Sequence, residues 1–138
     1  MSALLLDTCA AIWLSAQEPM AAAAIAAIDQ AAAERALWLS PITAWETALK
    51  VQSGRPDAPR VGISAAHWYV SLLALPGVRE AALNGAVALR SVSLPPIHRD
   101  PADRFLIATA IELGAAIVTR DARIIDYAAA GVVEVLVC

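Results

Sequence analysis

Short apolar runs that end in an acidic residue constrain the fold of this chain more than any other feature. Residues 3–6 form one such run and lead into Asp7, and residues 115–119 form a second, which Asp121 follows closely. Short continuous apolar runs are typical of strands buried on both faces of a parallel sheet. Because parallel strands have their carboxyl ends at one edge of the sheet, Asp7 and Asp121 are expected on the same side.

The rest of the chain alternates between helix and strand signals. Further strands are expected at residues 37–39, 78–83 and 132–137. Helices are expected at 9–16, 19–35, 42–52, 64–75, 84–90, 101–113 and 122–127. Serine, asparagine or aspartate before a helix and proline at its first position mark several of these starts. The pattern predicts an α/β fold with a central parallel sheet of about four to five strands flanked by helices, and it places 132–137 near the sheet's edge.

Length and charge limit the function classes. A chain of 138 residues with 59% hydrophobic composition is long enough for one sizeable core, so we expect a single domain over residues 1–138. The net charge of -3 argues against a protein that holds nucleic acid by bulk charge alone. A local site stays open, because Arg99, Arg104, Arg120 and Arg123 gather around the acidic residues of the carboxyl half, although solvated helix ends would explain them equally.

Cysteine use and hydropathy predict a cytoplasmic protein without a membrane segment. Cys9 and Cys138 lie near opposite ends of the chain, and a domain this apolar needs no disulfide, so reduced thiols are expected. The first residues lack the pattern of a secretory signal. The longest apolar window, residues 20–28, falls well below the roughly 18 residues of a membrane-spanning helix.

Acidic residues also crowd the stretch from His98 to residue 110. Asp100 before Pro101 has the pattern of a helix cap, and Asp103 in the first turn is favoured by the helix dipole, so both have a structural explanation. If several carboxylates share one cleft, they must be protonated or must bind a hard divalent cation, and oxygen ligands suit Mg²⁺ or Mn²⁺. Zinc is disfavoured, since the two histidines and two cysteines form no cluster with zinc spacing.

The helix expected at 42–52 carries one further acid. Ile42, Trp45 and Leu49 recur at helical spacing and are expected on its buried side, with Glu46 beside them. Spacing alone favours a surface pair between Glu46 and Lys50, worth about 0.2–0.5 kcal/mol.

Four segments in order resemble a known family. They are Leu5-Leu6-Asp7-Thr8, the segment from Ser40-Pro41 to Trp45-Glu46, residues 100–110 (DPADRFLIATA), and Val118-Thr119-Arg120-Asp121. Together they resemble the PIN-domain ribonucleases and, within these, the VapC-type toxins of bacterial toxin–antitoxin pairs. The resemblance spans nearly the whole chain. It implies a PIN-like fold in which Asp7, Glu46, Asp103 and Asp121 form an acidic catalytic quartet, and it favours a site role for Glu46 over the surface pair.

The resemblance also implies a chemistry. It implies hydrolysis of RNA phosphodiester bonds by a water that Mg²⁺ or Mn²⁺ activates, with Asp7, Asp103 and Asp121 as metal ligands and Glu46 as ligand or general base. Further residues are expected to support the site: Thr8 and Thr119 by orienting ligands, Asp100 as a fifth carboxylate that its capping role already explains, and Arg99, Arg104 and Arg120 by holding phosphates. Metal binding would offset the quartet's charge and leave a nearly neutral or slightly basic surface.

Partners follow from the same resemblance. It implies an RNA substrate, a cognate antitoxin and a homodimer, with the helices around Trp13 and Ile25 as candidates for apolar contacts with a protein partner. Two alternatives remain. A receiver-like magnesium-binding domain would need a lysine after a late strand, whereas the single lysine, Lys50, lies within a helix. A non-catalytic protein-binding module would need the acids to be mere helix caps.

Overall fold

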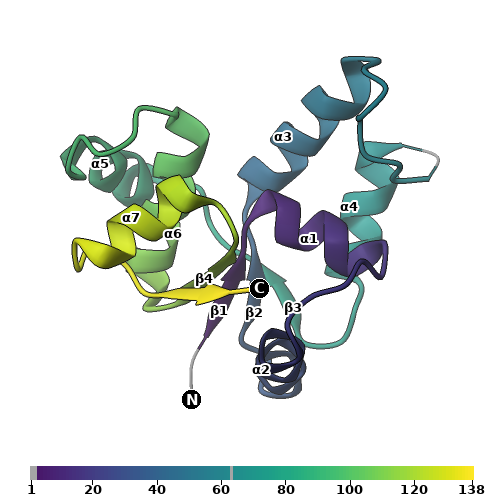
Figure 1. Cartoon of the computed structure of the whole chain (residues 1–138), viewed down its shortest axis with the longest axis horizontal. Coiled ribbons are helices and arrows are strands. Elements are labelled where there is room, and N and C mark those ends of the chain that lie inside the picture. The colour runs from purple at the N-terminus through teal and green to yellow at the C-terminus, as the bar shows by residue number, and fades with distance from the viewer. Residues whose placement is uncertain (1–2, 63) are drawn as a thin grey trace.

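Five parallel strands form the centre of the molecule. The computed structural model describes residues 3–62 and 64–138. The strands are β1 (Leu4–Leu6), β2 (Leu37–Leu39), β3 (Val78–Glu80), β4 (Ala116–Thr119) and β5 (Val135–Val137), in the spatial order β3-β2-β1-β4-β5 (Figure 1). Every neighbouring pair is parallel. The predicted α/β fold with a parallel sheet is confirmed, and β5 lies at a sheet edge as expected.

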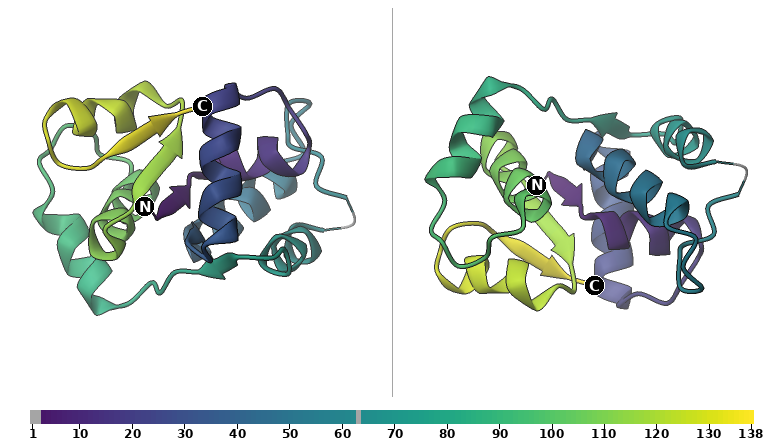
Figure 2. Two further views of the ribbon diagram at one scale, coloured as in Figure 1. Left: turned by 90° about the horizontal axis from the view of Figure 1, so that it is seen from below. Right: turned by 90° about the horizontal axis from the view of Figure 1, so that it is seen from above.

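Seven helices connect and cover the strands in the described part of the chain. They are α1 (Thr8–Ser15), α2 (Ala22–Ala33), α3 (Pro41–Gln52), α4 (Ala65–Leu73), α5 (Gly85–Ser93), α6 (Pro101–Leu113) and α7 (Ala122–Ala129). Helices α5, α6 and α7 lie on one side of the sheet, opposite α1, α3 and α4 (Figures 1 and 2). The caps expected at Ser40, Ser64, Asn84 and Asp100 all form, since each side chain accepts a bond from a backbone N–H in the following turn.

The core consists of two clusters, one on each face of the sheet, so β1 is buried on both faces. Leu4 and Leu6 pack in one cluster with side chains of α1, α2 and α4. Leu5 points the other way and packs with Ile117 and side chains of α6 and α7. Leu6 pairs with Val118, so β1 and β4 end side by side. The residues that follow these two strands are therefore neighbours, as the sequence predicts.

The buried face of α3 differs from the expected one. Ile42 is buried, but Trp45 is 55% exposed and Leu49 is 47% exposed. Thr43 and Thr47 are buried instead. Small side chains on this face let α3 approach its neighbours closely, and the hydroxyls of Thr43 and Thr8 lie 3.3 Å apart. The rotation that exposes Trp45 leaves Glu46 half-buried between the core and solvent.

None of the described helices combines the length and the apolarity that a bilayer-spanning segment requires.

Candidate active site

Asp7 lies at the carboxyl edge of the sheet, where the predicted acids gather; we call this the acidic edge. It follows β1, caps α1 by accepting a 2.7 Å bond from the backbone N–H of Ala10, and is only 5% exposed. Its second oxygen accepts a hydrogen bond from the hydroxyl of Thr119. Burial raises the pKa of Asp7 above its ordinary value, against these two hydrogen bonds, and the charges of Asp121 and Glu46 raise it further. A buried carboxyl of this kind favours a proton or a bound cation.

Thr119 connects Asp7 to the acid after β4. This fully buried residue ends β4, donates its hydroxyl hydrogen to Asp7, and accepts a 3.0 Å bond from the backbone N–H of Asp121. Asp121 caps α7 and accepts bonds from the backbone and guanidinium of Arg123. Partial burial raises the pKa of Asp121, but the hydrogen bonds and charge of Arg123 outweigh it, so the pKa lies below its ordinary value. Asp121 is therefore held as a carboxylate.

Glu46 reaches the same edge from α3. The hydroxyl of Thr8, the residue after Asp7, donates a 2.6 Å hydrogen bond to Glu46 Oε1. Within residues 3–62 and 64–138 no ion pair joins Glu46 to Lys50, whose Nζ lies 3.9 Å from Cys9 Sγ instead. The surface pair that spacing favoured does not form.

Asp103 completes the group from the first turn of α6. It is 7% exposed, and its Oδ2 lies 2.7 Å from His98 Nε2. Burial raises the pKa of Asp103, against the bond from His98, and the charges of Asp100, Asp121 and Glu46 raise it further. The charges of Asp121 and Glu46 thus act on both Asp7 and Asp103, so the four predicted acids share an electrostatic environment.

The donor set fits a hard or borderline divalent cation. Within the described residues, one group of three places its ligand atoms within 4.8 Å of one another, and it consists of His98, Asp100 and Asp103. Asp7, Glu46 and Asp121 lie outside that group, so of the four predicted acids only Asp103 belongs to it. Carboxylate oxygens suit Mg²⁺ or Mn²⁺, and the His98 Nε2 already contacts Asp103. Asp100 both caps α6 and belongs to this group.

His98 is the site residue that sequence reasoning missed. A single imidazole has no spacing pattern, and only its position two residues before Asp100, in the acid-rich stretch, could have indicated it.

Two of the three arginines expected to hold phosphates have other partners. Arg104 donates to the carbonyl oxygens of residues 91, 94, 95 and 98 and to the hydroxyl of Tyr127. Arg120 donates to the carbonyl oxygens of Pro19 and Cys138 and stacks on Trp13, with 4.1 Å from its Cζ to the ring centroid. Both therefore fasten loops. Arg99 is exposed, and no hydrogen bond or ion pair of its side chain is found within the described residues.

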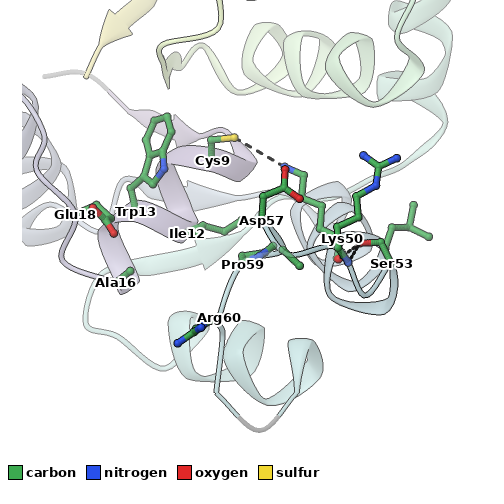
Figure 3. Close-up of a pocket in the computed structure, with 13 residues that line it drawn as sticks. Cys9, Ile12, Trp13, Ala16, Glu18, Lys50, Ser53, Asp57, Pro59 and Arg60 are labelled. Atoms are coloured by element: carbon green, nitrogen blue, oxygen red, sulfur yellow. Dashed lines mark hydrogen bonds between the residues drawn. The ribbon is translucent and has the colours of Figure 1, made fainter.

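A pocket of about 700 Å³ is lined by Cys9 and Lys50, and none of the four predicted acids lines it. It lies between α1, the end of α3 and the loop at 53–60, and Figure 3 shows Cys9 and Lys50 pointing toward each other across it. Cys9 comes two residues after Asp7, and Lys50 lies about one turn after Glu46. Its wall is partly apolar, with Ile12, Trp13 and Leu49, and partly charged.

The chain is a parallel α/β domain with acidic residues at the carboxyl edge of its sheet, the edge at which open α/β sheets bind ligands. The family model of the PIN domain matches residues 4–130. The chain therefore belongs to the PIN-domain family, which excludes a receiver-like domain.

The relatives agree with this assignment. The chain is 34% identical over 126 residues to Ribonuclease VapC22 of Mycobacterium tuberculosis, a match that covers 90% of this chain and 91% of that protein. Two solved structures share the fold. The VapBC2 complex of Rickettsia felis bound to a promoter DNA fragment matches with a TM-score of 0.70 and 12% identity, covering 97% of both chains. The DNA-bound VapBC complex of Salmonella typhimurium matches with a TM-score of 0.68 and 12% identity, covering 99% and 98%.

Proposed function

We propose that this protein is a Mg²⁺- or Mn²⁺-dependent endoribonuclease that acts as the toxin of a toxin–antitoxin pair. The observation that carries the proposal is the pairing of two buried acids, Asp7 and Asp103, with the more accessible Asp121 and Glu46 at one sheet edge. Burying carboxylates costs free energy unless hydrogen bonds, a proton or a cation compensates, and one divalent cation would compensate both acids. The similarity to a VapC ribonuclease supports RNA as the substrate.

Each acid of the site has a proposed role. Asp7, Asp103 and Asp121 would hold the ion, with Asp100 nearby, and Glu46 would hold the ion or accept the proton of the attacking water. A bound ion would neutralise the carboxylates, polarise the scissile phosphate and lower the pKa of a bound water. No nucleophilic side chain is required.

Neighbouring residues keep the acids in place. Thr8 holds Glu46, and Thr119 holds Asp7, each through its hydroxyl. Of the predicted arginines, Arg99 is the one we assign to a substrate phosphate, because Arg104 and Arg120 are occupied by backbone carbonyls.

The test is cleavage of a pool of cellular RNAs by purified protein with Mg²⁺, with Mn²⁺ and with EDTA. Cleavage is expected only with a divalent ion. Asp7→Asn should slow it by on the order of 100-fold or more, since a metal site contributes several kcal/mol to the transition state. Asp29→Asn, an exposed acid on α2, is the matched control and should cleave at the wild-type rate. Persistent cleavage in EDTA would overturn the proposal, and absence of cleavage under all conditions would favour a non-catalytic binding module.

The antitoxin and the homodimer belong to the same proposal. We infer a cytoplasmic protein of one domain, consistent with its two free thiols. The helices around Trp13 and Ile25 remain the proposed contacts for a protein partner, through exposed alanines of α2 such as Ala22 and Ala26, because Trp13 and Ile25 are themselves half-buried. Co-purification from the native host should yield a small protein encoded beside this chain that suppresses cleavage, and sedimentation should show a dimer. Recovery of an uninhibited monomer would contradict this part and leave the nuclease activity intact.

A further inference from the structure

His98 is placed unusually firmly for a loop residue. Its side chain is 11% exposed, and its Nε2 lies 2.7 Å from Asp103 Oδ2. Its backbone N–H donates a 3.1 Å bond to the hydroxyl of Tyr127, and its carbonyl accepts a 3.1 Å bond from Arg104. Both polar groups of the residue's backbone are thus hydrogen-bonded, and the contact with Asp103 sets the direction of the ring.

Tyr127 and Arg104 form the support beneath this loop. Tyr127 is fully buried, and its hydroxyl donates to the carbonyl of Pro95 at 2.8 Å while accepting from His98 N and from Arg104 Nη1. A hydroxyl can donate one bond and accept two, so it is saturated. Arg104 also holds the carbonyl of Leu94 at 2.9 Å. Because Arg104 follows Asp103 in α6, the helix that bears the acid also fixes the loop that bears the imidazole.

We propose that His98 is a positioning residue that orients Asp103 for the cation, and that Tyr127 and Arg104 act through it. This inference rests on the proposed metal-dependent function. With its Nε2 committed to Oδ2, His98 holds the carboxylate in one orientation. Among the described residues no hydrogen bond is made to the other oxygen of Asp103, which leaves that oxygen for an ion. Residues that hydrogen-bond to a metal ligand fix its rotamer and raise its affinity for the metal.

The test is direct Mn²⁺ binding to the full chain, measured from the free Mn²⁺ signal in electron paramagnetic resonance, together with cleavage rates. His98→Ala should weaken Mn²⁺ binding about 10- to 100-fold, as is typical for loss of a residue that hydrogen-bonds to a metal ligand. Its cleavage rate should fall at low Mn²⁺ and recover at saturating Mn²⁺, whereas KM for RNA stays unchanged. Tyr127→Phe should produce a smaller change in the same direction, because it releases the loop without removing the imidazole.

Two conservative variants separate positioning from folding. The amide nitrogen of Gln can replace Nε2, so His98→Gln should restore most of the affinity, whereas His98→Asn is too short to reach Asp103 and should not. His67→Ala, at the other histidine, which is exposed on α4, should bind Mn²⁺ like the wild type. If His98→Ala bound Mn²⁺ as tightly as the wild type, or if His98→Gln and His98→Asn bound it equally, the inference would be overturned. The proposed function would then still stand. If the wild type neither bound Mn²⁺ nor cleaved RNA, the proposed function would fall first, and this inference with it.

Discussion

The hydroxyl of Thr8 donates a 2.6 Å hydrogen bond to Glu46, two residues that lie 38 positions apart in the chain. Thr8 directly follows Asp7, so this bond ties the acid on α3 to the end of β1. It gives Glu46 a place at the acidic edge and excludes the surface role that helical spacing alone favoured.

Removing this hydroxyl should therefore impair cleavage more than stability. Thr8→Val keeps the shape of the side chain but frees Glu46, and we expect cleavage about 10- to 100-fold slower at a fixed Mg²⁺ concentration. Thr8→Ser keeps the hydroxyl and should stay within a few-fold of the wild type. Rates of RNA cleavage measure the difference, and equal rates for the two variants would argue against this role.

Thr119 should matter for folding as well. Thr119→Val leaves a buried carboxylate oxygen of Asp7 without its donor and the N–H of Asp121 without its acceptor. We expect a loss of about 1–3 kcal/mol in the free energy of unfolding, measured by denaturant titration. Thr119→Ser retains both bonds and should lose less. If the serine variant were as unstable as the valine variant, packing of the methyl group rather than hydrogen bonding would be responsible.

The buried acids should destabilise the metal-free protein at neutral pH. The folded-state pKa of Asp103 is raised above the ordinary value of 3.8 by burial, so the folded protein binds this proton more tightly than the unfolded chain. The stability contributed by the protonated form is present below pH 3.8 and is lost as pH rises through the folded-state pKa.

Asp103→Asn removes this loss of stability at rising pH, because an amide does not ionise. In EDTA at pH 7 we expect a Tm higher by about 3 °C, which corresponds to about 1 kcal/mol for a domain of this size. The gain should shrink as pH falls toward 3.8, where the wild-type carboxyl is itself neutral. Thermal melts across pH measure both effects, and a Tm that is lower in the variant at every pH would contradict the direction of the shift.

The exposed face of α3 gives a test outside the site. Trp45 is 55% exposed, whereas Trp68 is 6% exposed and donates a 2.9 Å bond to Ser15. Trp45→Ala should cost less than about 1 kcal/mol, and Trp68→Ala about 3–5 kcal/mol. Urea titration of the two variants compares them, and similar losses would mean that Trp45 is packed in solution.

Most of the architecture could be predicted because it depends on local patterns. Continuous apolar runs predicted β1, β2 and β4 closely, whereas β3 and β5, expected at 78–83 and 132–137, are each shorter than expected because apolar side chains continue beyond the residues that pair. Caps such as Ser40 and Asp100 marked helix starts because the side-chain bonds that define them span only a few residues.

The failures concern how elements rotate and what surrounds a charged group. Periodicity assigned Trp45 to the core, but the close approach of Thr43 to Thr8 turns α3 the other way. The place of Arg104 among the acidic residues suggested a contact with phosphate, but its guanidinium donates to carbonyl oxygens of a loop instead. The position of His98 in the acid-rich stretch was the one sign of a role, and its contact with Asp103 depends on how the loop folds. Such contacts depend on tertiary geometry that a single sequence does not display.

The chemistry of the RNA ends tests the central claim most directly. If Asp7, Glu46, Asp103 and Asp121 support attack by a cation-activated water, cleavage in ¹⁸O-labelled water with Mn²⁺ should give one linear phosphate monoester that carries ¹⁸O and one hydroxyl end. An RNA with a 2′-deoxy sugar at the cleaved position should react at a similar rate. A 2′,3′-cyclic phosphate product, or cleavage that continues unchanged in EDTA, would contradict the account.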